Sequence, residues 1–276
     1  NHYQVELLYQ LQLGTLRHLL VEADMAKGEK RLSRYEATIY SQLGEDGILV
    51  EILRRIGVTN RHFVEFGSGN GSENSTVALL MAGWSGLWMD AHAPFLEEAK
   101  TRFADLAASR RLRLQMAQVN AENIEDLLRA AETPASFDVL SIDIDRNDYW
   151  VWKAITSFTP RLVVIEYNAI FPPGVDWVVN YEPESWWDNT SHFGASLTAL
   201  ERLGREKGYA LVGCNLLGSN AFFVRRELAE DRFDEPFTAE NHYQPPRYEM
   251  VWHKGGHWRR VAPAAVFEMP FPEARR

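Results

Sequence analysis

The sequence contains a single cysteine, Cys214, among its 276 residues, and it has fewer basic than acidic residues. One cysteine excludes an internal disulfide and a cysteine-rich zinc site, so we expect a reducing, cytoplasmic location. The 29 lysines and arginines against 38 aspartates and glutamates give a formal net charge of −9, which argues against nucleic acid as a partner. No stretch approaches the ~20 apolar residues that cross a bilayer, and the first residues lack a signal-peptide pattern, so no membrane partner is expected.

The composition, with 46% hydrophobic residues, is sufficient for one sizeable core flanked by two terminal segments. Apolar residues recur among charges between positions 5 and 27, which predicts an N-terminal helical extension over 1–40. We expect this extension to act as a lid or as the contact of a homo-oligomer. Residues 228–276 are rich in proline and aromatic residues and are predicted to form a tail that packs on a central domain at 41–227.

Strand-like and helix-like segments alternate between residues 62 and 167, and one of the helices is expected at Pro94–Ala108. Such alternation predicts a mostly parallel sheet with helices on both faces. A β-hairpin follows, formed by Tyr209–Asn215 and Ala221–Arg225. Together these seven strands predict an α/β, Rossmann-like fold with the sheet plan of class I methyltransferases. The five parallel strands are expected at His62–Phe66, Gly86–Met89, Leu112–Val119, Phe137–Ile144 and Leu162–Tyr167.

A glycine-rich turn follows the first expected strand. Glu65 ends this strand, and Gly67, Gly69 and Gly71 occupy alternate positions after it. Glycine lets the backbone turn sharply and lets a ligand approach closely, although such a turn can also be purely structural. The G-x-G-x-G spacing differs from the G-x-G-x-x-G fingerprint of dinucleotide sites. It therefore favours S-adenosylmethionine (SAM), which has no pyrophosphate to bind at a helix N-terminus.

Two polar residues at neighbouring strand ends extend this predicted cofactor site. Asp90 ends the second strand about 20 residues after the glycines, where a carboxylate can accept both ribose hydroxyls. Its alternative role is to cap the next helix. Asn120 follows the third strand and is expected to contact adenine, because ligands of open sheets bind at the carboxyl edge. Gln42 and Asp143 complete the predicted cofactor contacts.

The chain resembles the FkbM-type methyltransferases over residues 41–226. The resemblance lies in the glycine-rich turn and in three further segments, Gly44–Ile48, Ser141–Trp150 and Val163–Glu166. It implies SAM-dependent methylation of hydroxyl groups on small molecules such as polyketides and sugars. Two departures lie where the acceptor is expected: Arg146 replaces a glycine of the family, and a long aromatic insertion covers 171–192.

Oxygen-bearing side chains follow the fourth and fifth strands. Asp143 and Asp145 come after the fourth strand, and Glu166 and Asn168 end the fifth. Metal-dependent O-methyltransferases of the catechol type have a similar arrangement, and Mg²⁺ or another hard divalent cation prefers such ligands. Two other interpretations stay open. Asp143 could instead bind the amino group of the cofactor's methionine or cap a helix, and Glu166 could pair with Arg146 or Lys153.

His192 is the first candidate for a general base, because the ordinary pKa of histidine lies near neutrality. Asp143 and Arg146 are the other predicted catalytic residues, and His92, His253 and His257 are further candidate bases. The aromatic residues of the insertion could form a lid or a wall for the acceptor, or could pack in a dimer contact. These residues are Phe171, Trp177, Tyr181, Trp186 and Trp187.

These patterns together predict an enzyme that transfers a methyl group from SAM to a hydroxyl of a small molecule. The acceptor is expected to be a natural product or sugar-like compound. One alternative is a SAM-dependent N-methyltransferase that needs no metal, and another is a non-catalytic module that binds SAM or a nucleoside. The oxygen cluster between Asp143 and Asn168 argues against the module, because binding alone does not require it.

Overall fold

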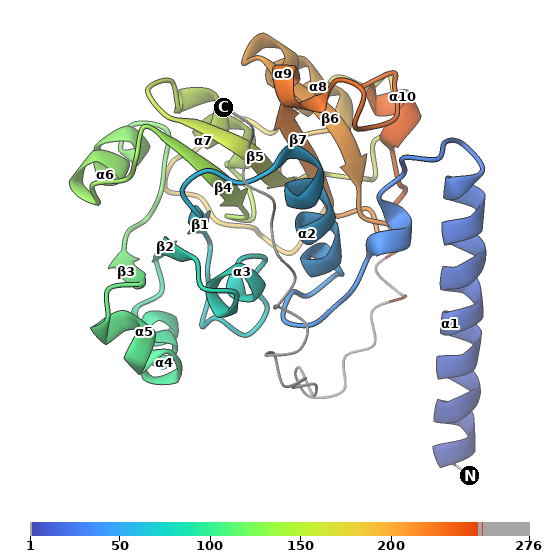
Figure 1. Ribbon diagram of the computed structural model, residues 1–276, viewed down its shortest axis with the longest axis horizontal. Helices are drawn as coiled ribbons and strands as arrows, with labels where there is room; N and C mark the ends of the chain where they lie inside the picture. The colour runs from blue at the N-terminus through green and yellow to red at the C-terminus, as the bar shows by residue number, and fades with distance from the viewer. Residues whose placement is uncertain (1, 248–249, 251–276) are drawn as a thin grey trace.

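The computed structural model describes residues 2–247 and residue 250, and a seven-stranded sheet forms its centre (Figure 1). The strands are β1 (His62–Phe66), β2 (Ser85–Asp90), β3 (Leu112–Met116), β4 (Ser136–Ile142), β5 (Thr159–Glu166), β6 (Tyr209–Cys214) and β7 (Asn220–Arg225). Their order is β3-β2-β1-β4-β5-β7-β6. The first five strands are parallel, β7 is antiparallel to β5, and β6 is antiparallel to β7. The predicted α/β fold with a late hairpin is therefore confirmed.

Helices cover both faces of the sheet because successive strand side chains point to opposite sides. In β1, for example, Phe63 belongs to one hydrophobic core, whereas Val64 and Phe66 belong to the other. The core that contains Phe63 packs against α2 (Glu45–Ile56), α3 (Val77–Met81) and α4 (Ala93–Arg102). The other core packs against α6 (Ile124–Ala130), α7 (Asp148–Ala154) and α8 (Leu197–Glu206).

Several element boundaries differ from those expected, and two of the differences have a local explanation. The helix expected over 94–108 is divided at Phe103 into α4 and α5 (Ala104–Ala108), and the Phe103 ring packs edge-on against Trp88 at 5.1 Å. Strand β3 ends at Met116 rather than at Val119. The next N–H, that of Ala117, donates the last hydrogen bond to β2, at the Asp90 carbonyl. The remaining short elements are η1 (Ser33–Tyr35), α9 (Arg226–Ala229) and α10 (Ala239–His242).

The strand order reverses between β1 and β4, which lie side by side in the middle of the sheet. The chain leaves β1 toward β2 on one side and leaves β4 toward β5 on the other. Such a reversal opens a crevice at the carboxyl ends of the two strands, where ligands of open α/β sheets bind. The predicted glycine-rich turn and Asp143 both lie at this edge.

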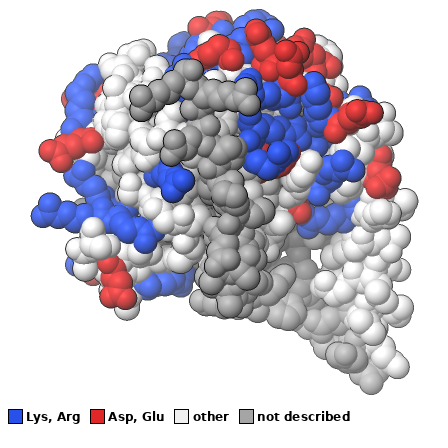
Figure 2. All heavy atoms as spheres, viewed as in Figure 1, with Lys and Arg blue, Asp and Glu red and all other residues white. Residues whose placement is uncertain are grey.

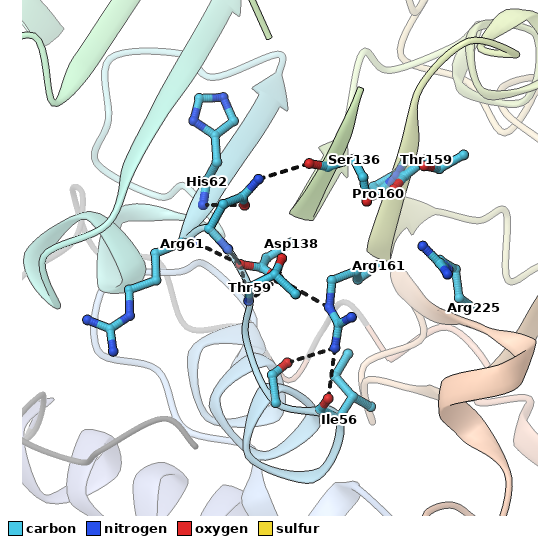
Figure 3. A network of polar contacts seen from close by, with 12 residues as sticks. Ile56, Thr59, Arg61, His62, Ser136, Asp138, Thr159, Pro160, Arg161 and Arg225 are labelled. Atoms are coloured by element: carbon cyan, nitrogen blue, oxygen red, sulfur yellow. Dashed lines mark hydrogen bonds and ion pairs between the residues drawn. The ribbon is translucent and has the colours of Figure 1, made fainter. Parts of the chain in front are cut away.

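At the opposite edge of the sheet a buried ion pair joins the beginnings of β1, β4 and β5 (Figure 3). Asp138 of β4 is fully buried, and its carboxylate lies 3.2 Å from the Arg161 guanidinium of β5. The same carboxylate accepts hydrogen bonds from the backbone N–H groups of Thr59, Asn60 and Arg61, which precede β1.

Arg161 also connects this ion pair to helix α2. Its Nη2 donates to the carbonyls of Ile56 and Gly57, at 2.8 Å and 3.2 Å, where α2 ends. Carbonyls at a helix C-terminus lack partners within the helix, and a guanidinium satisfies them. One buried pair therefore holds three strands and a helix together.

Helix α1 (His2–Met25) stands apart from the sheet and its covering helices (Figure 1). The Arg17 side chain ties it to the Glu36 carboxylate at 3.0 Å. No charged residue occurs between positions 7 and 16, and on the face shown in Figure 2 the free end of the helix has no blue or red spheres. Its exposed large apolar side chains are Val5, Leu7, Leu8, Leu11, Leu16 and Leu19. Within residues 2–247, no helix is both long and apolar enough to cross a membrane.

We expect Asp138→Ala to lower the free energy of unfolding by about 3–5 kcal/mol, because Arg161 would keep a buried charge without its carboxylate. The matched control is Asp176→Ala, which removes the exposed partner of Arg202 at 2.9 Å and should cost no more than about 1 kcal/mol. Urea unfolding followed by tryptophan fluorescence measures both values. Equal losses in the two variants would contradict the role of the Asp138 pair.

Candidate functional site

The three glycines of the turn after β1 have different surroundings. Gly67, Gly69 and Gly71 all have positive φ, at 69°, 51° and 76°. A Cβ on Gly67 would lie 1.6 Å from the Asp143 carbonyl oxygen, and one on Gly71 would lie 2.5 Å from the Phe103 ring. A Cβ on Gly69 would meet nothing within 4 Å. Gly67 and Gly71 are therefore required by packing, whereas Gly69 presents open backbone to a cavity.

Asp90 holds the glycine-rich turn from the end of β2. Its Oδ2 accepts the Gly69 N–H and its Oδ1 accepts the His92 N–H, each at 2.7 Å. The N-cap of α4 is His92, so Asp90 does not cap that helix. Each carboxylate oxygen can accept more than one hydrogen bond. Asp90 therefore keeps capacity for the hydroxyls of a ligand.

A first cavity of about 350 Å³, here called the Asp90 cavity, lies at the ends of β2, β3 and β4. Its walls are formed by 89–92, 117–119 and 143–145, together with Gly67, Gly69, Phe95, Asn147, Pro183, Ser185 and Trp186. Asn120 is not part of this lining. Its Oδ1 accepts the Asn123 N–H at 2.9 Å, and Gln118 takes the place expected for it beside the cavity.

A second cavity of about 360 Å³, here called the Glu45 cavity, lies on the other side of the glycine-rich turn. It shares Gly67, Gly69, Phe95 and Asp143 with the Asp90 cavity. Polar side chains dominate the rest of its lining, which comprises Gln42, Glu45, Glu65, Ser68, Asn70, Ser72, Glu73, Asn74, Ser75, Ser141 and Asn220. The two cavities together offer one continuous set of walls around the turn.

Glu45 is a buried carboxylate of this second cavity that sequence reasoning did not select. Asn220 of β7 donates to its Oε1 at 2.8 Å, and the Leu43 N–H donates to its Oε2 at 2.9 Å. These bonds fix the carboxylate at the first turn of α2. The only sequence signal was its place inside Gly44–Ile48, one of the segments that resemble the FkbM-type family.

Glu65, which was predicted to contact the cofactor, is held by its own chain. Its carboxylate accepts hydrogen bonds from the Thr76 hydroxyl and the Ser75 N–H, at 2.5 Å and 2.9 Å. Trp88 Nε1 donates in turn to the Thr76 hydroxyl. Burial raises the pKa of Glu65. The contacts show that Glu65 shapes the chain between the glycine-rich turn and α3.

Four carboxyl groups gather where β4 and β5 end. Burial, followed by the charges of Asp148 and Asp145, raises the pKa of Asp143 well above its ordinary value. Burial and the Asp143 charge raise the pKa of Glu166 in the same way. Burial also raises the pKa of Asp148 to about 7. Because most nearby charges are negative, a positively charged ligand would be stabilised here.

The predicted metal ligands do not converge. Asn168 is fully buried, and its amide donates to the carbonyls of Ser191 and Phe193 at 2.8 Å and 2.9 Å. Within the part of the chain that the structure describes, no group of three or more His, Cys, Asp or Glu side chains is arranged to hold a metal ion. A divalent cation at Asp143, Asp145, Glu166 and Asn168 is therefore unsupported by the described residues.

Arg146, another predicted catalytic residue, contacts the insertion. Arg146 is buried and pairs with Glu182 at 3.2 Å, so it does not pair with Glu166. Lys153 is no partner of Glu166 either: its Nζ lies over the Trp150 ring.

The histidines predicted as bases lie apart from one another. The His192 ring packs edge-on against Trp177 at 5.5 Å and is not part of either cavity lining. His92 lines the Asp90 cavity, where its ring lies 5.0 Å from that of Phe95. His253 and His257 lie outside the described residues.

No family model and no curated protein matches the chain. Among solved structures, a putative caffeoyl-CoA O-methyltransferase from Staphylococcus aureus is 14% identical, with a TM-score of 0.44 over 64% of this chain and 81% of that one. A TehB-like SAM-dependent methyltransferase from Corynebacterium glutamicum is 13% identical, with a TM-score of 0.36 over 64% and 86% of the two chains. PKMT2 from Rickettsia typhi, in complex with AdoHcy, is 14% identical with a TM-score of 0.31 over 42% of this chain, which spans only 24% of PKMT2. The fold assignment therefore rests on the sheet order, and the function rests on the site.

The raised pKa of Asp148 predicts a pH dependence of stability. The folded carboxyl, with a pKa of about 7 against 3.8 for the free group, keeps a proton that the unfolded chain has already lost. This carboxyl therefore lowers stability as the pH rises from about 4 to 7. Asp148→Asn keeps an oxygen for the Ile144 N–H but cannot ionise. We expect its unfolding free energy to fall less between pH 5 and 7, by up to about 1.4 kcal/mol per pH unit.

Urea titrations at pH 5, 6, 7 and 8 on both proteins measure this difference. The comparison between variant and wild type removes the contributions of Glu36 and Asp46, whose pKa values burial also raises. Parallel pH profiles for the two proteins would show that Asp148 does not titrate as expected.

Proposed function

We propose that the chain is a SAM-dependent methyltransferase in which one SAM molecule spans both cavities. The observation that carries this proposal is the lining that the two cavities share at Gly67, Gly69 and Asp143. The Asp90 cavity would hold the adenosine half, with the Asp90 carboxylate accepting ribose hydroxyls. The methionine half would pass the open backbone of Gly69 into the Glu45 cavity.

The residues present suit such a molecule. Bound SAM supplies an electrophilic methyl group on a positively charged sulfonium. Asp143 lies between the two cavities and can accept a hydrogen bond from the ammonium group of the methionine half. The carboxylates of Asp143 and Glu45 stabilise positive charge, and no lysine or arginine is part of either cavity lining among the described residues.

The acceptor would enter through the Glu45 cavity. Methyl transfer is an in-line displacement, so positioning of the two reactants supplies much of the rate. Asp143 lines the Glu45 cavity beside the proposed path of the methionine half, so it is the residue to which a hydroxyl proton of the acceptor would pass.

The acceptor class follows from the cavity and from the FkbM-type resemblance. Hydroxyl, amide and carboxylate groups line the Glu45 cavity, and Phe95 is its one large apolar residue among those described. Such walls favour a hydrophilic small molecule with several hydroxyl groups over an apolar one. O-methylation of a sugar-like acceptor is therefore the specific activity that we propose.

Calorimetric titration of SAM and of its demethylated product, S-adenosylhomocysteine (SAH), tests the cofactor site. We expect wild type to bind both ligands and Asp90→Ala to bind each at least about 10-fold more weakly, because the ribose contacts and the bond to Gly69 are lost. The matched control is Glu98→Ala. Glu98 itself lines neither cavity, and this variant removes only its exposed contact with the same turn, to Asn70 at 2.7 Å.

Absence of heat with SAM and SAH in wild type would refute the proposal. Binding of a nicotinamide dinucleotide in their place would favour a dehydrogenase. An equal rise in the Kd for SAM and SAH in Asp90→Ala and Glu98→Ala would show that the turn as a whole, rather than the Asp90 carboxylate, determines affinity.

We also propose that α1 mediates self-association through its exposed leucines. The double variant Leu8→Glu/Leu11→Glu places two charges in the uncharged part of the helix and should give monomers in light scattering. The control, Gln10→Glu/Gln12→Glu, adds the same charge at exposed polar positions of the same turns and should keep the oligomer. A monomeric wild type at all protein concentrations would contradict this proposal.

A further inference from the structure

The insertion at 171–192 is fastened to the strand ends that form the Asp90 cavity. Gln118, after β3, donates from Nε2 to the Pro183 carbonyl at 3.2 Å. Asn147, before α7, donates from Nδ2 to the Glu182 carbonyl at 2.9 Å. Two elements that line the cavity thus hold the same short stretch of the insertion.

Directly after these anchors, the insertion enters the wall of the cavity. Pro183, Ser185 and Trp186 line the Asp90 cavity, and no residue of the insertion lines the Glu45 cavity among those described. The insertion is therefore placed beside the proposed adenosine site and not beside the proposed acceptor site. This placement differs from the sequence-based expectation of a lid or wall for the acceptor.

Trp186 differs from the other aromatic residues of the insertion. Phe171 and Trp177 stack on each other at 4.5 Å, and Trp187 donates from Nε1 to the Thr190 carbonyl at 2.6 Å. Trp186 lines the cavity with 54% of its surface exposed, and its ring stacks on no other ring of the described residues. A half-exposed indole beside a cavity has an apolar face available for a planar ligand.

Asn147 adds a polar group to the same wall. It is only 4% exposed, and its Oδ1 has no hydrogen-bond partner within the described residues. A buried acceptor without a donor is costly, and a ligand that supplies the donor recovers this free energy. The exocyclic amine of adenine is such a donor on a planar ring.

We propose that Trp186 stacks on the adenine of the bound cofactor and that Asn147 Oδ1 accepts its exocyclic amine. The insertion is then a clasp for the adenosine half of the ligand, anchored by Gln118 and Asn147. This inference rests on the proposed function, because it assumes that SAM or SAH occupies the Asp90 cavity.

Calorimetric titration with SAH and with adenosine, on Trp186→Ala and Trp187→Ala, tests the clasp. Stacking of a base on an aromatic side chain predicts a rise in Kd of about 10-fold for Trp186→Ala. The Kd of adenosine should rise by the same factor as the Kd of SAH, because the lost contact is to the base. Trp187→Ala, at the next position but outside the cavity, should bind both ligands within about 2-fold of wild type.

Tryptophan fluorescence gives a second readout that requires no loss of affinity. SAH should quench the emission of wild type and of Trp187→Phe, and the quenching should be largely lost in Trp186→Phe. Both tryptophans are about half exposed, at 54% and 44%, so neither variant is expected to disturb folding. Circular dichroism spectra identical to wild type would verify this.

The outcomes separate the clasp from the proposed function. Tight SAH binding by wild type with an unchanged Kd for Trp186→Ala would overturn the clasp and leave the cofactor assignment standing. A higher Kd of Trp186→Ala for SAH with an unchanged Kd for adenosine would also overturn the clasp, because the lost contact would then be to the amino-acid half. If wild type bound neither ligand, the proposed function itself would fail.

Discussion

The close approach of β1 and β4 at their carboxyl ends is the constraint on which the site depends. Gly67 lies so near the Asp143 carbonyl that any Cβ would overlap it. The Asp143 N–H donates to the Phe66 carbonyl, which keeps the two chains paired up to the point where they diverge. Both cavities include this point in their lining, so a larger residue at Gly67 would separate the strands and disturb the two cavities together.

The carboxyl groups near Asp143 repel one another when they are ionised, and this repulsion lowers the stability of the fold. The Arg146 guanidinium, three residues along the chain, is committed to Glu182 and to the carbonyl of His192, where it positions the insertion. Burial and the neighbouring carboxylates raise the pKa values of Asp143 and Glu166, because a bound proton neutralises the carboxylate that would otherwise be repelled. A sulfonium cofactor would replace that proton, so the same crowding that weakens the free protein favours the proposed ligand.

Local patterns were enough to predict the sheet, the glycine-rich turn and the place of Asp90 at the end of β2, since apolar alternation and glycine spacing act within a few residues. Residues brought together by tertiary contacts were not predictable. Glu45 is held in its cavity by Asn220, far along the chain. Gln118 lines the Asp90 cavity, whereas the Asn120 side chain is used in a local turn. The metal hypothesis is unsupported for a related reason: strand position predicted that Asn168 lies at this edge, but its side-chain amide donates to the Ser191 carbonyl and holds the insertion.

The two edges of the sheet differ in what their polar groups face. At the amino edge, the Asp138 carboxylate receives backbone hydrogen bonds and an ion pair, which fixes the strand beginnings. At the carboxyl edge, buried Ser68 and Asn147 each keep a side-chain oxygen without a partner among the described residues, and each lines one of the two cavities. The unpartnered oxygens of Ser68 and Asn147 thus leave hydrogen-bonding capacity at the edge where the two cavities lie.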